Sequence, residues 1–495
     1  MVQSGTLLVN RERHQLTTNG TLPDRFQLVG GFWRLCSTSD LVYPNGVTET
    51  INKAVVLGAG TMGSQIAALL AGHGIPCDLL DLASDGVRRS RLAEDAIRRL
   101  PKLRPSPVFA EADLALIRSG NFSDDLSRVG ETDWVVEAVT EDLDVKRDLW
   151  SRVAGQVRPD VLVSTNTSGI PIRFIAEALP PPLRAHFLGT HFFNPPRYLK
   201  LLEVIAGPDT SPEVVATATK LAEGLLDRRV VLAHDVPGFI ANRLWAYGTL
   251  ATLRAAERLG LGPDEVDGIT GRAMGRPNSA TFRTLDLVGL DVFISICDNM
   301  QDSLSDPDDK AAFKAPSYLR EMVARGWTGE KTGQGFYKRT ELAGERQILA
   351  LDPGTFEYQP RRGVSSASLE AALDENDPSR RLKRLTNSDD RAARLAWASL
   401  SPLMAYAARN VGVAADDIAG IDRAMTWGFG WELGLFDIWD TLGVAETVAR
   451  MKSDGLAIPD WVETLAGRST GFYRNEAERK VQFMTDGHYA PLPAD

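Results

Sequence analysis

The apolar positions of this chain follow one pattern before residue 237 and another after it. Before it, short apolar runs at 54–57 and 77–80 predict strands, and the helical spacing of 66–70 places a helix between them. Later apolar runs, at 134–139, 161–164 and 187–193, are separated by polar segments with helical spacing. This alternation of strands and helices predicts a mainly parallel, doubly wound sheet.

Beyond the turn-forming sequence at 235–238, the strands are expected to stop. The segments 239–259 and 264–274 each predict an amphipathic helix, and helical spacing resumes at 391–411. Between them, the segment 341–390 carries prolines, glycines and a serine-rich stretch, which predicts a long connection.

Four short motifs of the helical half occur twice in the same order. The pairs are Asp264 to Ile269 with Asp416 to Ile421, Arg272 to Met274 with Arg423 to Met425, Leu285 to Leu290 with Ile438 to Gly443, and Gly335 to Tyr337 with Gly471 to Tyr473. Because the separations are similar, the four matches predict a duplicated helical domain.

The first fifty residues show no sustained period of 2 or 3.6 and lack the apolar segment of a signal peptide. We expect either a poorly ordered extension or a mis-assigned start. In the second case translation would begin at Val47, just before the first strong strand. The mass of the native protein distinguishes the two.

A glycine-rich turn follows the first strong strand and opens the first helix. Gly58, Gly60 and Gly63 have the GxGxxG spacing, and Asp81 lies 23 residues after Gly58, at the end of the next strand. In this context the motif predicts a dinucleotide site, with the pyrophosphate on the helix N-terminus and the carboxylate on the ribose hydroxyls. A carboxylate there repels a 2′-phosphate, so NAD is favoured over NADP. The alternative is a glycine-rich turn of another α/β protein.

The residues expected to contact the dinucleotide through this motif are Gly58, Gly60, Thr61, Met62, Gly63 and Asp81.

One histidine stands where an acid–base group would be useful. His191 ends an apolar run, two prolines follow, and 199–205 predicts a returning strand. If the two strands form a hairpin centred on Arg197, His191 lies opposite Glu203, close enough for a hydrogen bond. The carboxylate would then fix the imidazole tautomer, and the other ring nitrogen would take a proton from a substrate hydroxyl. The alternative is a buried histidine with a structural role.

The composition excludes several classes of partner. The net charge of −10, from 55 basic and 65 acidic residues, disfavours nucleic acid and anionic membranes. No apolar stretch is long enough to span a membrane. The three cysteines lie far apart, without metal-ligand or disulfide spacing, so we expect no metal and a reducing, cytoplasmic location.

The chain resembles the L-3-hydroxyacyl-CoA dehydrogenase family of fatty-acid β-oxidation. The resemblance covers roughly residues 51–340 and rests on five motifs: Gly58 to Gly63, Val135 to Ala138, Ser164 to Ser168, His191 to Glu203, and Val236 to Arg243. It implies an NAD-dependent oxidation of L-3-hydroxyacyl-CoA to 3-ketoacyl-CoA, with His191 as base and Glu203 as its orienting partner.

The resemblance also assigns residues that spacing alone does not. It implies that Ser168 and Asn242 hold the reacting oxygen. The alternatives on physical grounds alone are a helix N-cap for Ser168 and an exposed polar helix residue for Asn242. It further implies cofactor-side positions for three polar residues, Glu137, Lys146 and Asn166. The basic cluster Arg98, Lys102 and Arg104 follows Asp81 in an insertion, where the family places a helical arm near CoA, so these side chains are expected near the CoA phosphates; the alternative is a solvated face.

The segment beyond 340 resembles larger bacterial members in which the dehydrogenase is fused to an enoyl-CoA hydratase. This sequence stops at 495, about where that module would begin, so we expect a separate enoyl-CoA hydratase or thiolase partner, or a fragment. Family members with one helical domain dimerise through it. A duplicated domain would satisfy that surface within one chain, which predicts a monomer or weak homodimer.

The expected fold class is an α/β Rossmann-type NAD-binding domain followed by two all-α domains of the 3-hydroxyacyl-CoA dehydrogenase C-terminal type. The expected boundaries are 1–50 for the extension, 51–236 for the NAD-binding domain, 237–340 for the first helical domain, 341–390 for a linker, 391–480 for the second helical repeat and 481–495 for a tail. Two other functions stay open: a hydroxy-acid dehydrogenase that does not use CoA, and a non-catalytic NAD- or acyl-CoA-binding subunit of a β-oxidation complex.

Overall fold

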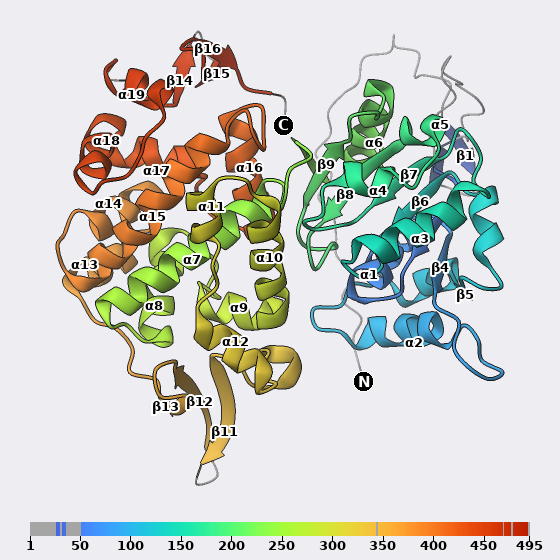
Figure 1. Cartoon of the computed structure of the whole chain (residues 1–495), viewed down its shortest axis with the longest axis horizontal. Helices are drawn as coiled ribbons and strands as arrows, with labels where there is room; N and C mark the ends of the chain where they lie inside the picture. Colours follow the sequence, from blue (N-terminus) through green and yellow to red (C-terminus); the bar gives the residue numbers. More distant parts are fainter. Residues whose placement is uncertain are drawn as a thin grey trace. The chain divides into compact units, whose positions relative to one another are not determined.

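The computed structural model describes residues 26–29, 32–35 and 51–493, apart from 343–344, 469 and 477–478 (Figure 1). The chain divides into an N-terminal unit, 1–46, and a large unit, 47–495. In the N-terminal unit, β1 (Phe26–Val29) and β2 (Phe32–Leu35) pair as an antiparallel hairpin, which the sequence pattern did not reveal. The other predictions for the first fifty residues lie outside the described residues.

The first half of the large unit is built on an eight-stranded sheet in the order β10-β9-β8-β7-β6-β3-β4-β5. Its strands are β3 (Ala54–Leu57), β4 (Cys77–Asp81), β5 (Ile117–Asn121), β6 (Trp134–Glu137), β7 (Leu162–Thr165), β8 (Phe187–Phe192), β9 (Leu201–Ala206) and β10 (Arg229–Ala233). From β5 to β8 neighbouring strands are parallel, in the strand order typical of dinucleotide-binding sheets, whereas β9 pairs antiparallel with β8. The predicted doubly wound sheet is confirmed.

Helices cover both faces of this sheet. They are α1 (Thr61–Gly72), α2 (Arg91–Arg99), α3 (Leu143–Ala154), α4 (Ile172–Ala176), α5 (Pro181–Arg184) and α6 (Pro212–Gly224). Successive residues of β3 enter opposite cores: Val55 packs in one hydrophobic cluster and Val56 in the other. A strand buried on both faces reads as a continuous apolar run, which explains the unbroken pattern at 54–57.

Helices form most of the second half of the large unit. The first set is α7 (Ala241–Leu259), α8 (Pro263–Thr270), α9 (Phe282–Val288), α10 (Leu290–Ser303), α11 (Pro307–Ala312) and α12 (Ser317–Ala324). The second set is α15 (Arg391–Asn410), α16 (Ile418–Phe429), α17 (Leu435–Leu442), α18 (Val444–Ser453) and α19 (Asp460–Ala466). The predicted helix 264–274 is interrupted after Thr270 and continues as a short 3-10 turn at Arg272–Met274.

Three expectations for this half are wrong. Strands do not stop after 238, because each set of helices ends in a three-stranded antiparallel sheet. The first sheet consists of β11 (Tyr337–Leu342), β12 (Glu345–Asp352) and β13 (Glu357–Pro360), and the second of β14 (Tyr473–Glu476), β15 (Arg479–Phe483) and β16 (Tyr489–Pro491). The segment 341–390 is therefore no linker: beyond β13 it also holds α13 (Ala367–Leu373) and α14 (Pro378–Thr386). The segment 481–495 is likewise not a free tail, because β15 and β16 pair within it.

Matching hydrogen bonds confirm the duplication. The carboxylate of Asp286 accepts from the amides of Phe336 and Tyr337 at 2.8 and 2.9 Å. In the second set the carboxylate of Asp440 accepts from the amides of Phe472 and Tyr473, at 2.6 and 2.8 Å.

The structure corrects the register of the first repeated motif. Asp267 caps the start of α9 and accepts from the hydroxyl of Tyr337. Its counterpart is Asp422, which accepts from the amide of Phe436 and the hydroxyl of Tyr473. The sequence matching had placed Ala419 opposite Asp267, about one helical turn away.

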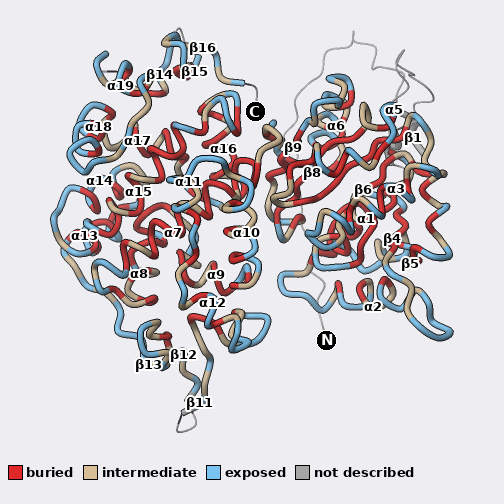
Figure 2. Tube along the Cα trace, in the orientation of Figure 1, coloured by how far each residue is buried: buried red, intermediate tan, exposed pale blue. Residues whose placement is uncertain are grey.

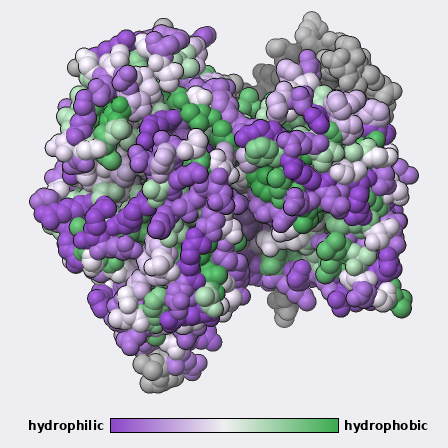
Figure 3. Space-filling view, viewed as in Figure 1, coloured by the Kyte–Doolittle hydropathy of each residue, from purple (hydrophilic) through white to green (hydrophobic). Residues whose placement is uncertain are grey.

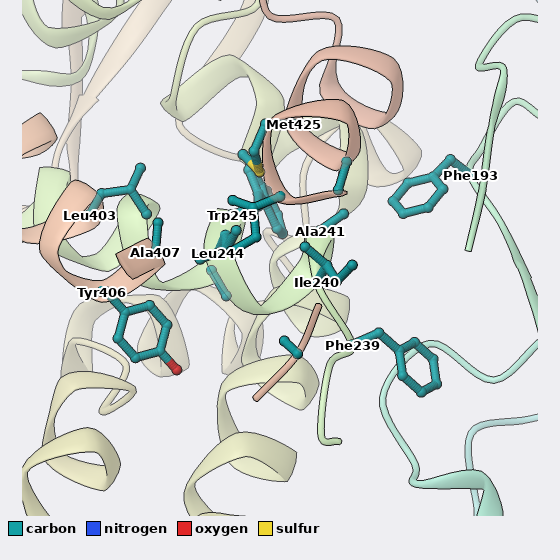
Figure 4. Packing of buried hydrophobic residues seen from close by; sticks show 14 of the residues in the cluster. Phe193, Phe239, Ile240, Ala241, Leu244, Trp245, Leu403, Tyr406, Ala407 and Met425 are labelled. Atoms are coloured by element: carbon teal, nitrogen blue, oxygen red, sulfur yellow. The ribbon is translucent and has the colours of Figure 1, made fainter. Parts of the chain in front are cut away.

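The two helical sets pack tightly along α7 and α15. The ring of Tyr247 stacks on that of Tyr406 with centroids 3.9 Å apart, and a Cβ on Gly248 would lie 2.7 Å from Leu403. Figure 2 shows both helices as largely buried, and Figure 4 shows side chains of α7, α15 and α16 meeting in one cluster with Phe193 of the sheet domain. Among the described residues, none of the helices has the length and apolar character needed to cross a membrane.

Candidate functional site

The three glycines of the turn between β3 and α1 have different surroundings. Gly58 has a φ of +104°, and a Cβ there would lie 2.6 Å from the carbonyl oxygen of Ala138. A Cβ on Gly63 would lie 1.8 Å from the carbonyl oxygen of Gly58, so the helix approaches the turn as closely as backbone allows. A Cβ on Gly60 would meet nothing within 4 Å, so this side of the turn is open.

The open side of the turn suits an anion. Gly60 is the N-cap of α1 and offers no side-chain cap, so the first amides of the helix are left to a ligand. Thr61 is exposed and Met62 half-buried at the same end. These observations fit the pyrophosphate of a dinucleotide, in the arrangement that the sequence predicted.

Asp81 lies beside this turn, at the end of β4. Its carboxylate accepts from the amides of Ala59 and Leu82 at 2.5 and 2.6 Å. These bonds hold the carboxylate at the carboxyl end of the sheet, next to the open side of the glycine turn. A ribose hydroxyl can donate to the lone pairs that remain.

The predicted hairpin between β8 and β9 has the predicted register. His191 pairs directly with Glu203 across the two antiparallel strands. Nδ1 of His191 lies 2.6 Å from Oε2 of Glu203, and both side chains are buried, with 4% and 0% of their surface exposed. A carboxylate in this position requires a proton on Nδ1, which leaves Nε2 as the basic nitrogen.

The second carboxylate oxygen of Glu203 holds the start of α7. Oε1 accepts from the amides of Ile240 and Ala241 at 3.1 and 2.9 Å. One buried carboxylate thus orients the histidine of the sheet domain and caps the first long helix of the helical half. The carboxylate accepts three hydrogen bonds, one from the imidazole and two from backbone amides, and these fix its position.

Ser168 and Asn242 come together beside this pair. Nδ2 of Asn242, in the first turn of α7, donates to the carbonyl oxygen of Ser168 at 3.3 Å. The amide of Ser168 donates to Glu141, and Ser168 caps no helix, because α4 begins after Pro171. Both side chains are half-buried, so neither a helix N-cap nor a fully exposed residue describes them.

Glu137 and Lys146 form a buried ion pair at the end of β6. Nζ of Lys146 lies 2.7 Å from Oε1 of Glu137, whose other oxygen accepts from the hydroxyl of Thr165 at 2.7 Å. Burial lowers the pKa of Lys146, but the carboxylates of Glu137 and Glu141 outweigh burial, and the pKa is raised overall. These contacts give both side chains a structural role, and direct contact with a cofactor stays a prediction.

Asn166 links the same strand ends to the hairpin. Its side-chain Oδ1 accepts from the backbone amide of Phe192, the residue after His191, at 2.9 Å. Its backbone amide donates to the carbonyl oxygen of Glu137. Asn166 therefore positions the backbone next to the imidazole. Its predicted place on the cofactor side is not tested by these contacts.

The three residues of the predicted basic cluster lie in the last turn of α2 and in the segment that follows it, and all three are exposed. Arg98 pairs with Asp95 on its own helix. Arg104 donates to the carbonyls of Pro101 and Leu103 at 2.9 and 2.8 Å. Lys102 is exposed. Contact of the three side chains with CoA stays a prediction.

Two aromatic rings that the sequence pattern did not indicate lie against the imidazole of His191. The rings of Phe193 and Phe239 lie 4.5 and 5.8 Å from the imidazole. Phe429, from the second helical set, stacks on Trp245 at 5.4 Å and lies 6.0 Å from Phe193 (Figure 4 shows Phe193 and Trp245). The duplicated set therefore contributes to the walls around His191, although no pattern in its sequence indicated this.

Two family models match consecutive parts of the chain. Residues 53–236 match the family described as "3-hydroxyacyl-CoA dehydrogenase, NAD binding domain", and residues 238–339 match "3-hydroxyacyl-CoA dehydrogenase, C-terminal domain". A probable 3-hydroxyacyl-CoA dehydrogenase of Bacillus subtilis is 41% identical over 454 residues, which are 89% of this chain and 57% of that protein. The chain thus spans little more than half the length of this curated relative.

Two further proteins extend the comparison. A probable 3-hydroxyacyl-CoA dehydrogenase of Deinococcus radiodurans is 44% identical over 292 residues, 59% of this chain and 84% of that protein. The crystal structure of 3-hydroxybutyryl-CoA dehydrogenase from Escherichia coli superposes with a TM-score of 0.62 at 23% identity, over 85% of this chain and 99% of that one. This last likeness shows the fold.

Proposed function

This chain belongs to the 3-hydroxyacyl-CoA dehydrogenase family, and from that premise we propose that it oxidises L-3-hydroxyacyl-CoA to 3-ketoacyl-CoA in fatty-acid β-oxidation, with NAD as the hydride acceptor. The observation that carries the proposal is the buried pair of His191 and Glu203, with Nδ1 and Oε2 2.6 Å apart. The pair lies in the same sheet domain as the glycine turn that fits NAD.

Each residue of the site has a separate role in the proposed reaction. The glycine turn and Asp81 would hold NAD, which would supply the acceptor for the hydride from C3 of the substrate. Nε2 of His191 takes the hydroxyl proton as that hydride leaves, and the imidazolium so formed is stabilised by Glu203. Ser168 and Asn242 are within reach of each other at the same site and would hold the reacting oxygen by hydrogen bonds. The rings around the imidazole exclude water from the transfer.

The family resemblance drawn from the motifs is confirmed, as are the fold class and the NAD-binding domain. The specific roles of the site residues, the CoA contacts of the basic arm and the partner enzymes remain part of this proposal. A separate enoyl-CoA hydratase or thiolase would supply or consume the acyl-CoA.

The decisive assay is consumption of NADH with acetoacetyl-CoA, run beside free acetoacetate. Turnover with the CoA ester alone, lost in His191→Ala and kept in the exposed control His488→Ala, supports the proposal. Turnover of the free acid would favour a dehydrogenase that does not use CoA. Binding of NADH without turnover of either substrate would favour a non-catalytic subunit.

The oligomeric state is a second part of the proposal. The second helical set packs against α7 along α15 and places Phe429 on Trp245, so the face of α7 is covered within one chain. We therefore expect a monomer or a weak homodimer. Light scattering over a dilution series measures this, and a dimer that persists at nanomolar concentration would contradict it.

A further inference from the structure

A cavity lies in the helical half, at the first three-stranded sheet. It has a volume of about 460 Å³ and lies between α8, the start of α9, β11, β12 and α13. None of its lining residues belongs to the site around His191. Much of its wall, including Arg339, Ile348, Arg361 and Leu373, comes from the segment at and beyond the end of the match to the family's C-terminal domain.

The cavity carries a local excess of positive charge. Four arginines line it, Arg272, Arg283, Arg339 and Arg361, against two carboxylates, those of Glu330 and Asp267. The sum is +4 − 2 = +2 at neutral pH, in a chain whose net charge is −10. Because most of the molecule is acidic, a concentrated positive site of this kind will attract anions to one place.

The two carboxylates do not neutralise the four guanidinium groups. Glu330 is shared, with Oε2 2.6 Å from Arg283 and Oε1 3.3 Å from Arg339. Asp267 is occupied by the amides of Thr281, Phe282 and Arg283 and by the hydroxyl of Tyr337.

The other two arginines keep donors free. Arg272 donates only to the amide oxygen of Asn376, at 3.3 Å, and the guanidinium of Arg361 lies 6.0 Å from the ring centre of Tyr337. Within the described residues, neither arginine has a carboxylate partner. Planar guanidinium groups with free donors bind phosphate oxygens in pairs of hydrogen bonds.

Apolar surface lies in the same cavity. Ile348 and Leu373 are exposed, with 47% and 38% of their surface accessible, and both line the cavity beside the ring of Tyr337. Around β11 to β13 the surface in Figure 3 is mainly hydrophilic, with scattered apolar residues. Guanidinium groups and apolar side chains together suit a molecule with an anionic head and a planar or apolar body, and the volume suits a ligand of nucleotide size.

We propose that this cavity is a second, non-catalytic binding site for an organic phosphate, with Arg272 and Arg361 on the phosphate and Ile348 and Leu373 against the body of the ligand. The proposal is independent of the reaction at His191, because the two sites share no residue.

Calorimetric titration of the full chain with AMP tests the site, with NAD held at saturating concentration so that the dinucleotide site is filled. Inorganic phosphate serves as the second probe and distinguishes a free phosphate from a phosphate ester. We expect AMP to bind, and to bind at least ten-fold more tightly than inorganic phosphate, because only AMP reaches the apolar wall. Equal affinities, or no binding of AMP, would overturn the proposal.

The double variant Arg272→Gln/Arg361→Gln should weaken AMP binding at least ten-fold and leave turnover of acetoacetyl-CoA unchanged. The matched control Arg346→Gln/Arg479→Gln removes the same charge from exposed positions on β12 and β15 that do not line the cavity, and should bind AMP as the wild type does. Arg361→Glu adds a repulsive charge and should abolish binding. Thermal melting checks that each variant is folded; equal loss in the control pair would assign the effect to net charge and refute the site.

Discussion

Replacement of Glu203 by glutamine tests whether the buried carboxylate fixes the tautomer of His191. Glutamine has the same shape, but only one of its two terminal atoms accepts hydrogen bonds. The amides of Ile240 and Ala241 already require an acceptor at 3.1 and 2.9 Å, so the amide oxygen of the glutamine will take that place. Its NH₂ group then faces Nδ1 of His191, which must become an acceptor.

This change reverses the tautomer of the imidazole. With Nδ1 as acceptor, the proton lies on Nε2, the nitrogen that has to receive the substrate proton. The loss combines the general-base contribution of about 10²–10⁴-fold with the lost stabilisation of the imidazolium. We therefore expect kcat to fall by about 10²–10⁴-fold, or about 3–5 kcal/mol of barrier at about 1.4 kcal/mol per ten-fold.

The measurement compares kcat with the affinity for NADH. In NADH oxidation with acetoacetyl-CoA, Glu203→Gln should lower kcat while the dissociation constant of NADH and the melting temperature change little. The control Glu213→Gln makes the same substitution on the exposed start of α6 and should have no effect. If Glu203→Gln retains kcat within three-fold, or lowers it further in a His191→Ala background, the orienting role of this carboxylate is refuted.

Three further predictions follow from particular contacts. Gly63→Ala places a methyl 1.8 Å from a carbonyl oxygen and should lower the melting temperature, whereas Gly60→Ala meets no atom within 4 Å and should keep stability but weaken NADH binding measured by fluorescence; the opposite pattern would contradict the assignment of the turn. Burial raises the pKa of Asp267 and of Asp286 to about 6, above the usual 3.8, so the folded state binds more protons than the unfolded state between these values. The contribution of each group to the free energy of unfolding therefore falls as the pH rises from about 4 to 6, by up to about 3 kcal/mol. In urea unfolding, the stability of the wild type relative to Asp267→Asn should fall over that range, and a constant difference would refute the prediction. Phe429→Ala removes a ring that supports the walls around the imidazole and should lower kcat/KM about ten-fold or more without changing NADH affinity; unchanged kcat/KM would separate the second helical set from the site.

The sequence predicted well those elements whose residue pattern allows only one arrangement in the fold. The register of His191 and Glu203 followed from two apolar runs, a proline-containing turn and the strict alternation of a strand, and a slip of one residue would have turned both side chains to the wrong face. The glycine turn was equally determinate, because its first and third glycines allow no Cβ and its second faces open space.

The features that the sequence did not predict depend on packing between distant segments. The strands at 337–342 and 345–352 contain charged and polar residues on both faces, because each lies in a small, exposed sheet and buries little. The residues that follow β12 include Pro353, Gly354, Pro360 and Gly363, which resemble those of a linker. Only the pairing of the strands with their neighbours reveals a sheet. Phe429 had no marker at all, since its position beside Phe193 results from the way α16 packs against the sheet domain.

The hydrogen bonds of Glu203 imply that this site cannot belong to the sheet domain alone. Two of the three groups that hold the carboxylate are amides at the start of α7, so the first helical set helps to fix the carboxylate that contacts His191. Without α7, a buried carboxylate would face His191 with one oxygen unsatisfied, which is costly in a low-dielectric interior. The second helical set then packs on α7 through α15 and Phe429. The second half of the chain thus stabilises the helix whose first amides hold the carboxylate of Glu203, which gives the duplicated domain a physical reason in the packing of α7.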